Sequence, residues 1–556
     1  MPLPIQLGSS HFPSIRAEGR LYVDKTGLVC EVLDAPAQVS LYPRPRRFGK
    51  TISMSMLQAF FEIGPDRAAL FADLQAWSDP ETRKHFQRYP VIALSLKDTK
   101  SPTWAECKSA LDVVLAREVE RHAAEIGGPD IPHGLRERLE DVIHRRGDTR
   151  NALRDLAEAL ALHHGERVVI LIDEYDAAVL SSWEHGYYDE CIQYMRRFMS
   201  AALKDNPVLF RAVLTGVLRV ARESMFSDLN NLEVYSPFQR DRPECYGFTE
   251  AEVAGLLSDF GRTSLADEVR RWYNGYRFGD STVYNPFSVM SMLAKPKEEL
   301  QGWWLNTSEN TLARELLLDH VDLHEQIATL LAGGSIETLV EDGVPLRELS
   351  GKNVWGLLLY AGYFSVVRTW HERTEHWAEL TLPNLEVRGL WESTFNRWLA
   401  DRTRGVGNLP DAVLAGDAPR IEAILGQMLL RHVSPEDVGA TKDEAFYHAF
   451  VLGLLVVLEG THAVRSNRGT GYGRADVQIL PKRPGLPGVV IEFKRRPRKP
   501  GERLKPIVAG ELEALADQAL AQIDDNKYTT ELAACGASPV HKLGIAFAGQ
   551  DVVVRG

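Results

Sequence analysis

Short runs of apolar residues that end in polar residues recur along the first half of the chain. Residues 168–172 are five consecutive apolar residues, followed by the acidic Asp173 and Glu174. Residues 91–96 and 209–215 are two further, largely apolar runs. Such runs are typical of strands that are buried on both faces of a parallel sheet. The stretch 104–164 has helical periodicity with alternating charges, so we expect an α/β fold with inserted helices here.

The last third of the chain has a different pattern. Residues 474–480 alternate between polar and apolar side chains, and residues 489–494 form a second apolar-rich run after a turn-rich segment. Two such runs around a turn predict a β-hairpin. Helical patterns flank this hairpin at 444–458 and 514–528.

At 556 residues the chain is too long for a single hydrophobic core. Most of the sequence between the two patterned regions has helical periodicity. We therefore expect an α/β domain at 1–247, a helical lid or junction at 248–300, a helical connecting domain at 301–436 and a second α/β domain at 437–556.

Residues 41–51 have the features of a phosphate-binding loop between a strand and a helix. Gly49 lets backbone N–H groups face a phosphate, Lys50 reaches the β and γ oxygens, and Thr51 offers a hydroxyl to Mg²⁺. Arg47 and Phe48 precede them in the loop. The general pattern requires glycine at position 44, where this chain has arginine.

The acidic end of the run at 168–172 supplies the expected partner of that loop. Asp173 would hold Mg²⁺ and Glu174 would orient the attacking water. A buried strand that stops at an acidic turn is the structural alternative. Together the two stretches predict ATP binding. They predict ATP hydrolysis less directly, because many regulatory ATPases keep the binding loop after catalytic activity has been lost.

Two residues after the run at 209–215 complete this first set. Thr215, at the predicted strand end, is a candidate to sense the γ-phosphate. Arg219 is a candidate to neutralise charge in the transition state, with Arg222 close behind it. Surface arginines on a short helix are the slightly favoured alternative for this pair.

The hairpin carries a second constellation. Residues two apart on a strand share a face, which puts Glu492 beside Lys494, and Asp476 on the partner strand can reach the same place. Two carboxylates that bind Mg²⁺, or Mn²⁺, with a lysine beside them suit metal-dependent phosphodiester cleavage. Glu444 on the preceding helix would complete the metal shell, and Gln522 lies on the helix that follows.

The charge of the chain is uneven. The formal net charge is −12, which argues against a protein that coats nucleic acid non-specifically. Basic residues nevertheless cluster at 494–499, beside the second constellation, as binding to a phosphate backbone would require. An exposed hairpin with alternating charges and a solvated basic loop remains the alternative.

The five cysteines are scattered and form no C-x-x-C pair, so neither a disulfide framework nor a zinc site is predicted. Cysteines of this kind fit a reducing cytoplasm. The longest apolar runs are far too short to cross a bilayer, so we expect a soluble cytoplasmic protein without a membrane partner.

An aromatic, turn-rich junction spans residues 272–279 and 284–287. Aromatic rings interleaved with arginine can stack on bases. A hinge or core between subdomains is the favoured interpretation, because aromatic residues are most often part of cores.

Several motifs together resemble a known group of proteins. They are YVDKT, RPRRFGKT, ILIDEYD, LTGVLR, WYNGYRFG, YNPFS, GRADV and IEFK, followed by a glutamine-containing helix that ends in KY. The set resembles bacterial AAA-ATPase-like proteins with a C-terminal PD-(D/E)XK nuclease domain. The resemblance covers most of the chain and is weakest between 313 and 443.

The resemblance implies a P-loop NTPase fold of the STAND or archaeal-ATPase type, with a restriction-endonuclease-like α/β domain at the C-terminus. It assigns Lys50, Thr51, Asp173 and Glu174 to the Walker positions. It assigns five residues to the nuclease motif: Glu444, Asp476, Glu492, Lys494 and Gln522. Alanine stands at position 475 in place of the proline of the motif.

These features favour an enzyme in which the nucleotide state of an ATPase controls a metal-dependent nuclease acting on nucleic acid, with a role in defence against mobile DNA as one setting. DNA is favoured over RNA as the substrate, and the sequence leaves the choice between them open. The alternative is a nucleotide-switched signalling or scaffold protein whose C-terminal fold binds without cutting. An ATPase that remodels nucleic acid is a third, weaker option. Assembly into a homo-oligomer is left open by the sequence.

Overall fold

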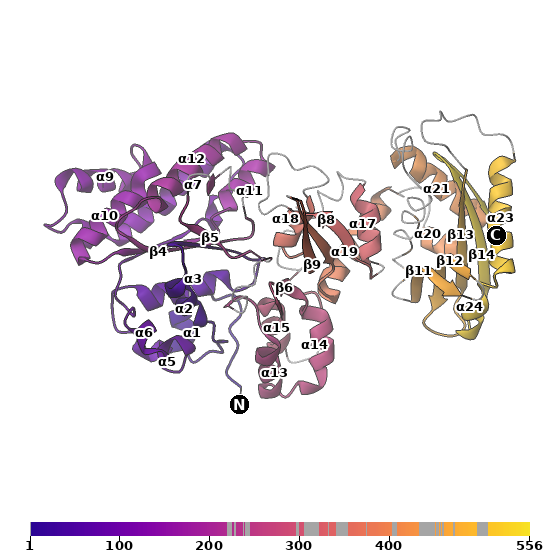
Figure 1. The fold of residues 1–556 in the computed structure, drawn as a ribbon, viewed down its shortest axis with the longest axis horizontal. Helices are drawn as coiled ribbons and strands as arrows, with labels where there is room; N and C mark the ends of the chain where they lie inside the picture. The colour runs from indigo at the N-terminus through magenta and orange to yellow at the C-terminus, as the bar shows by residue number, and fades with distance from the viewer. Residues whose placement is uncertain are drawn as a thin grey trace. The chain divides into compact units, whose positions relative to one another are not determined.

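The computed structural model describes two compact units of the chain. One unit comprises Met1–Ser308 with Glu337–Glu386, and the other comprises Glu309–Ile336 with Val387–Gly556 (Figure 1). The described residues are 2–219, 225–226, 229–236, 238, 245–295, 300–304, 322–331, 333–340, 354–373, 375–402, 409–432, 451, 455, 458, 461–470, 473–496 and 510–556.

The first unit is built around a five-stranded parallel sheet in the order β2-β3-β4-β1-β5. Its strands are β1 (Val39–Pro43), β2 (Val91–Ser95), β3 (Val168–Asp173), β4 (Leu209–Gly216) and β5 (Leu232–Val234). Every residue of β3 is buried. The predicted α/β fold is confirmed, and each of the three apolar runs singled out in the sequence is one of these strands.

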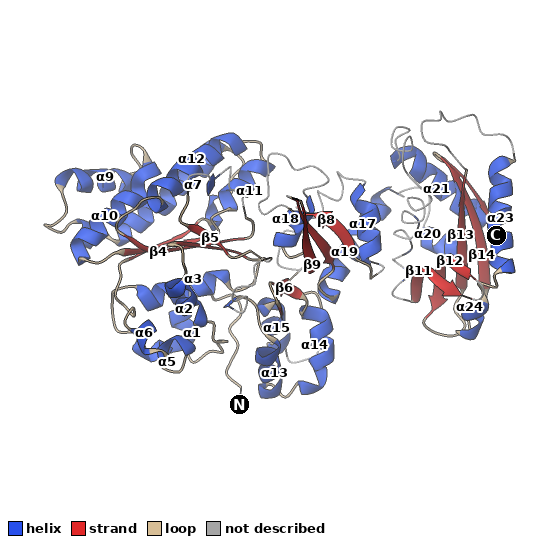
Figure 2. Ribbon diagram, viewed as in Figure 1, coloured by secondary structure: helices blue, strands red, loops and turns tan. Residues whose placement is uncertain are grey.

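Helices cover both faces of this sheet, as Figure 2 shows. One layer contains α1 (Phe12–Ala17), α2 (Gly27–Asp34), α3 (Lys50–Phe61), α5 (Gln75–Ser78) and α6 (Pro80–Arg83). The other layer contains α7 (Trp104–Arg121), α9 (His133–Ile143), α10 (Ala152–His164), α11 (Ala177–Glu184) and α12 (Tyr188–Leu203). Coverage of both faces explains why most residues of the central strands are apolar.

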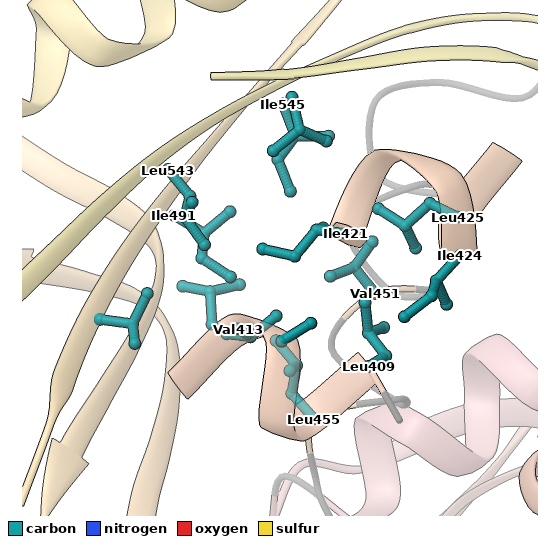
Figure 3. Packing of buried hydrophobic residues seen from close by; sticks show 14 of the residues in the cluster. Leu409, Val413, Ile421, Ile424, Leu425, Val451, Leu455, Ile491, Leu543 and Ile545 are labelled. Atoms are coloured by element: carbon teal, nitrogen blue, oxygen red, sulfur yellow. The ribbon is translucent and has the colours of Figure 1, made fainter. Parts of the chain in front are cut away.

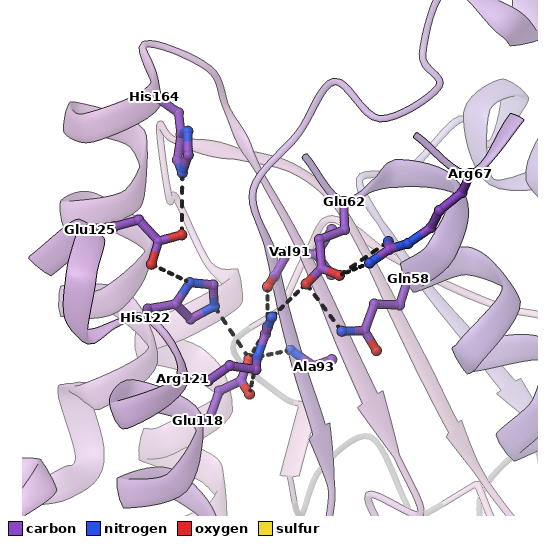
Figure 4. Close-up of polar contacts among 10 residues, drawn as sticks. All are labelled: Gln58, Glu62, Arg67, Val91, Ala93, Glu118, Arg121, His122, Glu125 and His164. Carbon is purple, nitrogen blue, oxygen red and sulfur yellow. Dashed lines mark hydrogen bonds and ion pairs between the residues drawn. The ribbon is translucent and has the colours of Figure 1, made fainter. Parts of the chain in front are cut away.

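Side chains of α7 form hydrogen bonds with backbone groups on the outer edge of the sheet. The amide of Ala93, on the edge strand β2, donates to Glu118 at 2.7 Å, and Arg121 donates to the carbonyl of Val91 at 2.6 Å. Arg121 also pairs with Glu118 and with Glu62 (Figure 4). An unpaired strand edge invites pairing with another chain, and this network occupies it instead.

The middle of the chain is mostly helical, as expected. It contains α13 (Glu250–Asp259), α14 (Ala266–Tyr273), α15 (Pro286–Leu293), α17 (Asp322–Leu331), α18 (Val354–Tyr360) and α19 (Leu385–Arg402). The Thr249 side chain accepts from the amide of Glu252, whose carboxylate accepts from the amide of Thr249, which is a capping box.

The sequence patterns did not reveal two small sheets in this region. The hairpin of β6 (Tyr276–Phe278) and β7 (Ser281–Val283) is one, and the other has the order β8-β10-β9. Its strands are β8 (Ile336–Leu339), β9 (Ser365–Glu372) and β10 (Glu375–Thr381). These strands are short or half exposed, so their patterns are weak.

The second unit has a mixed sheet in the order β11-β12-β13-β14-β15. The strands are β11 (His462–Thr470), β12 (Gly473–Pro481), β13 (Gly488–Arg495), β14 (Val540–Ala548) and β15 (Asp551–Arg555). β12 and β13 pair antiparallel, which confirms the predicted hairpin, and β13 and β14 pair parallel. The described helices after residue 408 are α20 (Leu409–Leu414), α21 (Ala418–His432), α23 (Glu511–Asp525) and α24 (Thr530–Ala534).

A hydrophobic core lies between this sheet and the helices α20 and α21 (Figure 3). Ile491, Leu543 and Ile545 come from the strands, and Val413 and Ile421 come from the two helices. The core fixes one face of β13, so alternate residues of that strand must point to the opposite face.

Among the helices that the structure describes, none combines the length and the apolar character that crossing a membrane requires.

Candidate functional site

The predicted phosphate loop joins β1 to α3. β1 ends at Pro43, and α3 begins at Lys50 with Gly49 as its N-cap residue. Gly49 has φ of 82° and Arg47 has φ of 68°, so two loop residues adopt the left-handed conformation. That conformation is uncommon outside glycine, which makes Arg47 a strained position in the loop. The loop therefore turns sharply into the N-terminus of a helix, the arrangement that receives phosphate groups.

The carboxylate of Asp173 joins the ends of β3 and β4 to the first turn of α3. The Thr51 hydroxyl donates to Asp173 Oδ2 at 2.7 Å, and the Thr215 hydroxyl donates to Asp173 Oδ1 at 2.5 Å. β4 lies between β1 and β3 in the sheet, which brings Thr215 between the loop and Asp173. Three residues predicted from separate motifs thus meet at one edge of the sheet.

The Lys50 ammonium is turned toward the loop itself. Lys50 is buried, and its Nζ donates to the carbonyls of Arg44 and Pro45, each at 2.9 Å. Burial lowers the pKa of Lys50, against the opposing charges of Asp173 and Glu174.

Glu174 and Arg219 follow the carboxyl ends of β3 and β4. Glu174 is half-buried directly after β3, and its φ of 52° is again left-handed. Arg219 is half-buried three residues after β4. Arg222, the second arginine of the pair, lies outside the described residues.

Asp176 is a residue of this region that sequence reasoning missed. Its Oδ2 accepts from the amides of Val217 at 2.9 Å and Leu218 at 2.7 Å, directly after β4. Burial raises the pKa of this carboxyl group. The sequence feature that could have indicated this residue is the second aspartate of the DEYD motif. Its hydrogen bonds connect the segment after β3 to the segment after β4.

Arg44, the departure from the general loop pattern, is buried in the core. Its guanidinium donates to the carbonyls of Pro43 at 2.9 Å and Tyr235 at 2.5 Å, and it lies over the rings of Tyr246 and Phe278. Burial lowers its pKa. Position 44 thus anchors the loop to neighbouring elements.

The predicted carboxylates of the second constellation also meet. The amide of Phe493 donates to Asp476 Oδ2 at 2.8 Å, and the amide of Asp476 donates to Glu492 Oε2 at 3.4 Å. Lys494 Nζ lies 3.3 Å from Glu492 Oε1. Phe493 belongs to the core on the other face of β13, so the predicted alternation along this strand is confirmed.

Gln522, on α23, contributes to the same place by donating its side-chain amide to Glu492 Oε1. Glu492 is 2% exposed. Burial and the neighbouring Asp476 raise the pKa of Glu492 to about 7, although Lys494 opposes the rise. A divalent cation between the two carboxylates would relieve both effects, so this donor set fits Mg²⁺ or Mn²⁺.

Glu444, the third predicted carboxylate, lies outside the described residues. Within the described ranges no group of three or more His, Cys, Asp or Glu side chains is placed to hold a metal ion. The basic cluster is described only up to Arg496, which pairs with Glu511 at 2.8 Å.

Comparison with known proteins yields matches to both regions. Residues 6–226 match a family model described as a predicted AAA-ATPase, and residues 442–555 match the PD-(D/E)XK nuclease superfamily. A protein of Azotobacter chroococcum mcd 1, described as an uncharacterized protein in the vnfD 5' region, is 27% identical over 576 residues. That alignment covers 99% of this chain and 98% of the relative.

Proposed function

The chain joins an AAA-ATPase-like domain to a C-terminal PD-(D/E)XK nuclease-like domain, and we propose that it is an ATPase whose nucleotide state controls a metal-dependent nuclease acting on DNA. Defence against mobile DNA is a setting that suits such an enzyme. The observation that carries the proposal is the buried Glu492, which Lys494 and Gln522 contact beside Asp476.

In the ATPase part, we assign a separate role in nucleotide binding or hydrolysis to each residue of the site. Lys50 would turn to the β and γ phosphates, and Thr51 with Asp173 would hold Mg²⁺. Glu174 would orient the attacking water, and Thr215, which now donates to Asp173, would register the γ-phosphate from the neighbouring strand. Arg219 would neutralise charge that develops on the phosphoryl group.

In the nuclease part, Asp476 and Glu492 would hold Mg²⁺ or Mn²⁺, and Glu444 is proposed to join them. The bound ion would supply positive charge to the scissile phosphate and lower the pKa of a water molecule. Lys494 would steady the attacking hydroxide or the phosphate charge. Gln522 would hold the orientation of Glu492 through its amide.

Cleavage of labelled DNA by the purified full chain tests this part of the proposal. We expect cutting that requires Mg²⁺ or Mn²⁺ and that disappears in Asp476→Ala. Glu511→Gln is the matched control, because it removes a carboxylate of the same domain that pairs with Arg496. Cutting that survives Asp476→Ala would overturn the site assignment, and DNA binding without cutting would favour the switch-and-scaffold alternative.

Equilibrium binding of a fluorescent ATP analogue and phosphate release test the ATPase part. Glu174→Gln should retain nucleotide binding and lose hydrolysis, because the amide cannot orient and polarise water as a carboxylate does. Hydrolysis at the parent rate in Glu174→Gln would remove this residue from the mechanism.

A further inference from the structure

The aromatic junction noted in the sequence packs directly onto the phosphate loop. Phe48 is buried, with its ring edge-on to Tyr276 at 4.9 Å and to Phe278 at 5.8 Å between ring centroids. The Arg44 guanidinium lies 4.6 Å from the centroid of Phe278. The prediction that these aromatic residues form a core is therefore confirmed, and the core that Tyr276 and Phe278 form includes residues of the phosphate loop.

Two further loop residues contact the same segments. Arg47 lies 4.9 Å from the ring centroid of Phe287. Gly362 has φ of 90°, and a Cβ atom there would lie 2.7 Å from Pro45 Cβ, so the backbone at 362 lies against the proline ring. We call residues 274–287 and 360–367 the aromatic module.

Lys50 contacts the same loop residues through their backbone carbonyls. The two carbonyls that accept from its Nζ belong to Arg44 and Pro45, whose side chains contact the aromatic module. Without nucleotide, the ammonium therefore holds the backbone of the segment that the module packs against.

A bound nucleotide competes for that ammonium. A lysine has three N–H donors and no acceptor, and two of the donors of Lys50 are already used by loop carbonyls. A phosphate-loop lysine reaches both the β and γ phosphates, which leaves donors for at most one carbonyl. At least one of the two bonds must be given up.

We propose that Lys50 is a nucleotide-operated latch, whose transfer from the carbonyls of Arg44 and Pro45 to the phosphates loosens the aromatic module. The proposal rests on the proposed ATP binding. It adds the route by which a change at the phosphate loop on nucleotide binding is transmitted to the aromatic module. Phe278, Phe287 and Gly362 are the positioning residues of that route, and none of them contacts the nucleotide in it.

Hydrogen bonds join the two segments of the module to each other through β9, and join the module to the residue before α19. The amide of Arg277 donates to Ser365 Oγ at 3.2 Å, and its guanidinium donates to the carbonyl of Val367 at 2.5 Å. Asn384 donates to the carbonyl of Asn274 at 2.8 Å, one residue before α19 begins. Loosening of the module thus acts on β9 and on the start of α19.

Amide hydrogen exchange of the full chain tests the latch without requiring nuclease activity. We expect Lys50→Met, without nucleotide, to speed exchange of peptides covering 274–283 and 360–367 by at least about fivefold, since each of the two lost hydrogen bonds contributes roughly a factor of this size. The parent protein with Mg²⁺ and ATP should show the same two peptides accelerated. Peptides of β3 serve as the reference for global stability.

Thr51→Ala is the matched variant, because it removes the bond to Asp173 and leaves both loop carbonyls on Lys50. It should leave module exchange at the parent rate. Phe278→Leu should keep affinity for a fluorescent ATP analogue within about threefold while abolishing the ATP-induced acceleration, because it retains apolar volume and loses the ring face.

The outcomes separate this inference from the proposed function. Unchanged module exchange in Lys50→Met, or equal acceleration in Thr51→Ala, would overturn the latch even if the protein binds and hydrolyses ATP. A parent protein that binds no ATP analogue would overturn the proposed ATPase, whereas the nucleotide-free comparison of Lys50→Met with the parent would still decide whether Lys50 restrains the module.

Discussion

The two candidate sites each combine a lysine with carboxylates, but the lysines have different partners. Lys50 donates to two backbone carbonyls, and Asp173 beside it accepts from the hydroxyls of Thr51 and Thr215. Lys494 instead lies against the buried carboxylate of Glu492. The first site is satisfied internally, so a substrate must displace bonds that already exist. The second site brings two carboxylates together, and a bound cation would compensate their negative charge.

The buried carboxylates show the same contrast from another side. Both Glu492 and Glu386 have a pKa raised to about 7, with burial as the main cause. Glu386 accepts from the Ser288 hydroxyl and the Trp304 amide, whereas the charge of Asp476 adds to the rise in the pKa of Glu492. A raised pKa alone therefore does not mark a metal site. The second carboxylate and the lysine beside Glu492 make the difference.

The largest expected effect is at the second site. Glu492→Gln should reduce metal-dependent DNA cleavage by about a hundredfold to a thousandfold, the loss typical when one preorganised charge is removed from an active site. Glu511→Gln should cut at the parent rate.

The same Glu492→Gln variant sharpens the contrast without any substrate. In the absence of divalent cations it should raise the thermal midpoint of the C-terminal unit, because a neutral amide replaces a carboxylate that burial disfavours. A lowered midpoint would mean that the carboxylate is already compensated without a metal ion.

Lys50→Ala addresses the first site. It should weaken binding of an ATP analogue by about tenfold to a hundredfold, since a hydrogen bond to a charged group contributes about 1.5–3 kcal/mol. Lys84→Ala, which removes an exposed lysine paired with Glu81, is the matched control for loss of positive charge. Equal binding by Lys50→Ala and the parent would contradict the nucleotide site.

The carboxyl group of Glu386 predicts a pH dependence of stability. Its pKa is about 7 in the folded chain and near 4.5 when exposed, so both states are protonated below pH 4.5. Between pH 4.5 and 7 the unfolded state loses the proton first, which lowers the free energy of unfolding by about 3 kcal/mol. Denaturant titrations should show a smaller decline in Glu386→Gln than in the parent, because Glu492 keeps its own contribution; parallel curves would rule out the contribution of Glu386.

The smallest expected effect concerns the contact between Gly362 and the phosphate loop. Gly362→Ala adds a Cβ atom against Pro45 at a left-handed residue, whereas Gly165→Ala adds one at φ of 66° with no atom within 4 Å. Overpacking should make Gly362→Ala about 1–2 kcal/mol less stable than Gly165→Ala in denaturant titrations. Equal free energies of unfolding for the two variants would show that the phosphate loop moves to accommodate the added Cβ atom without loss of stability.

Sequence patterns predicted the parallel sheet and the C-terminal hairpin because buried strands and alternating strands leave clear periodicities. They also predicted which groups meet around Asp173 and around Glu492, since motif residues at strand ends and on one strand face are placed by geometry alone. The roles assigned to these residues stay predictions.

Other features depend on contacts that are distant in the sequence. Nothing near Arg44 indicates that it packs on Tyr246 and Phe278 roughly two hundred residues later, where it anchors the loop. The β8-β10-β9 sheet was missed because β9 is largely exposed and lacks an apolar face. Asp176 was passed over because an aspartate that binds backbone amides has no spacing rule of its own.

The most direct test of nucleotide control is the rate of DNA cleavage by the full chain in Mg²⁺, measured with and without ATP for the parent, Lys50→Ala and Asp476→Ala. We predict a cleavage rate that ATP changes in the parent, that ATP leaves unchanged in Lys50→Ala, and that is lost in Asp476→Ala. Cleavage that responds to ATP equally in Lys50→Ala and the parent, or that persists in Asp476→Ala, would contradict a nuclease governed by the phosphate-loop site.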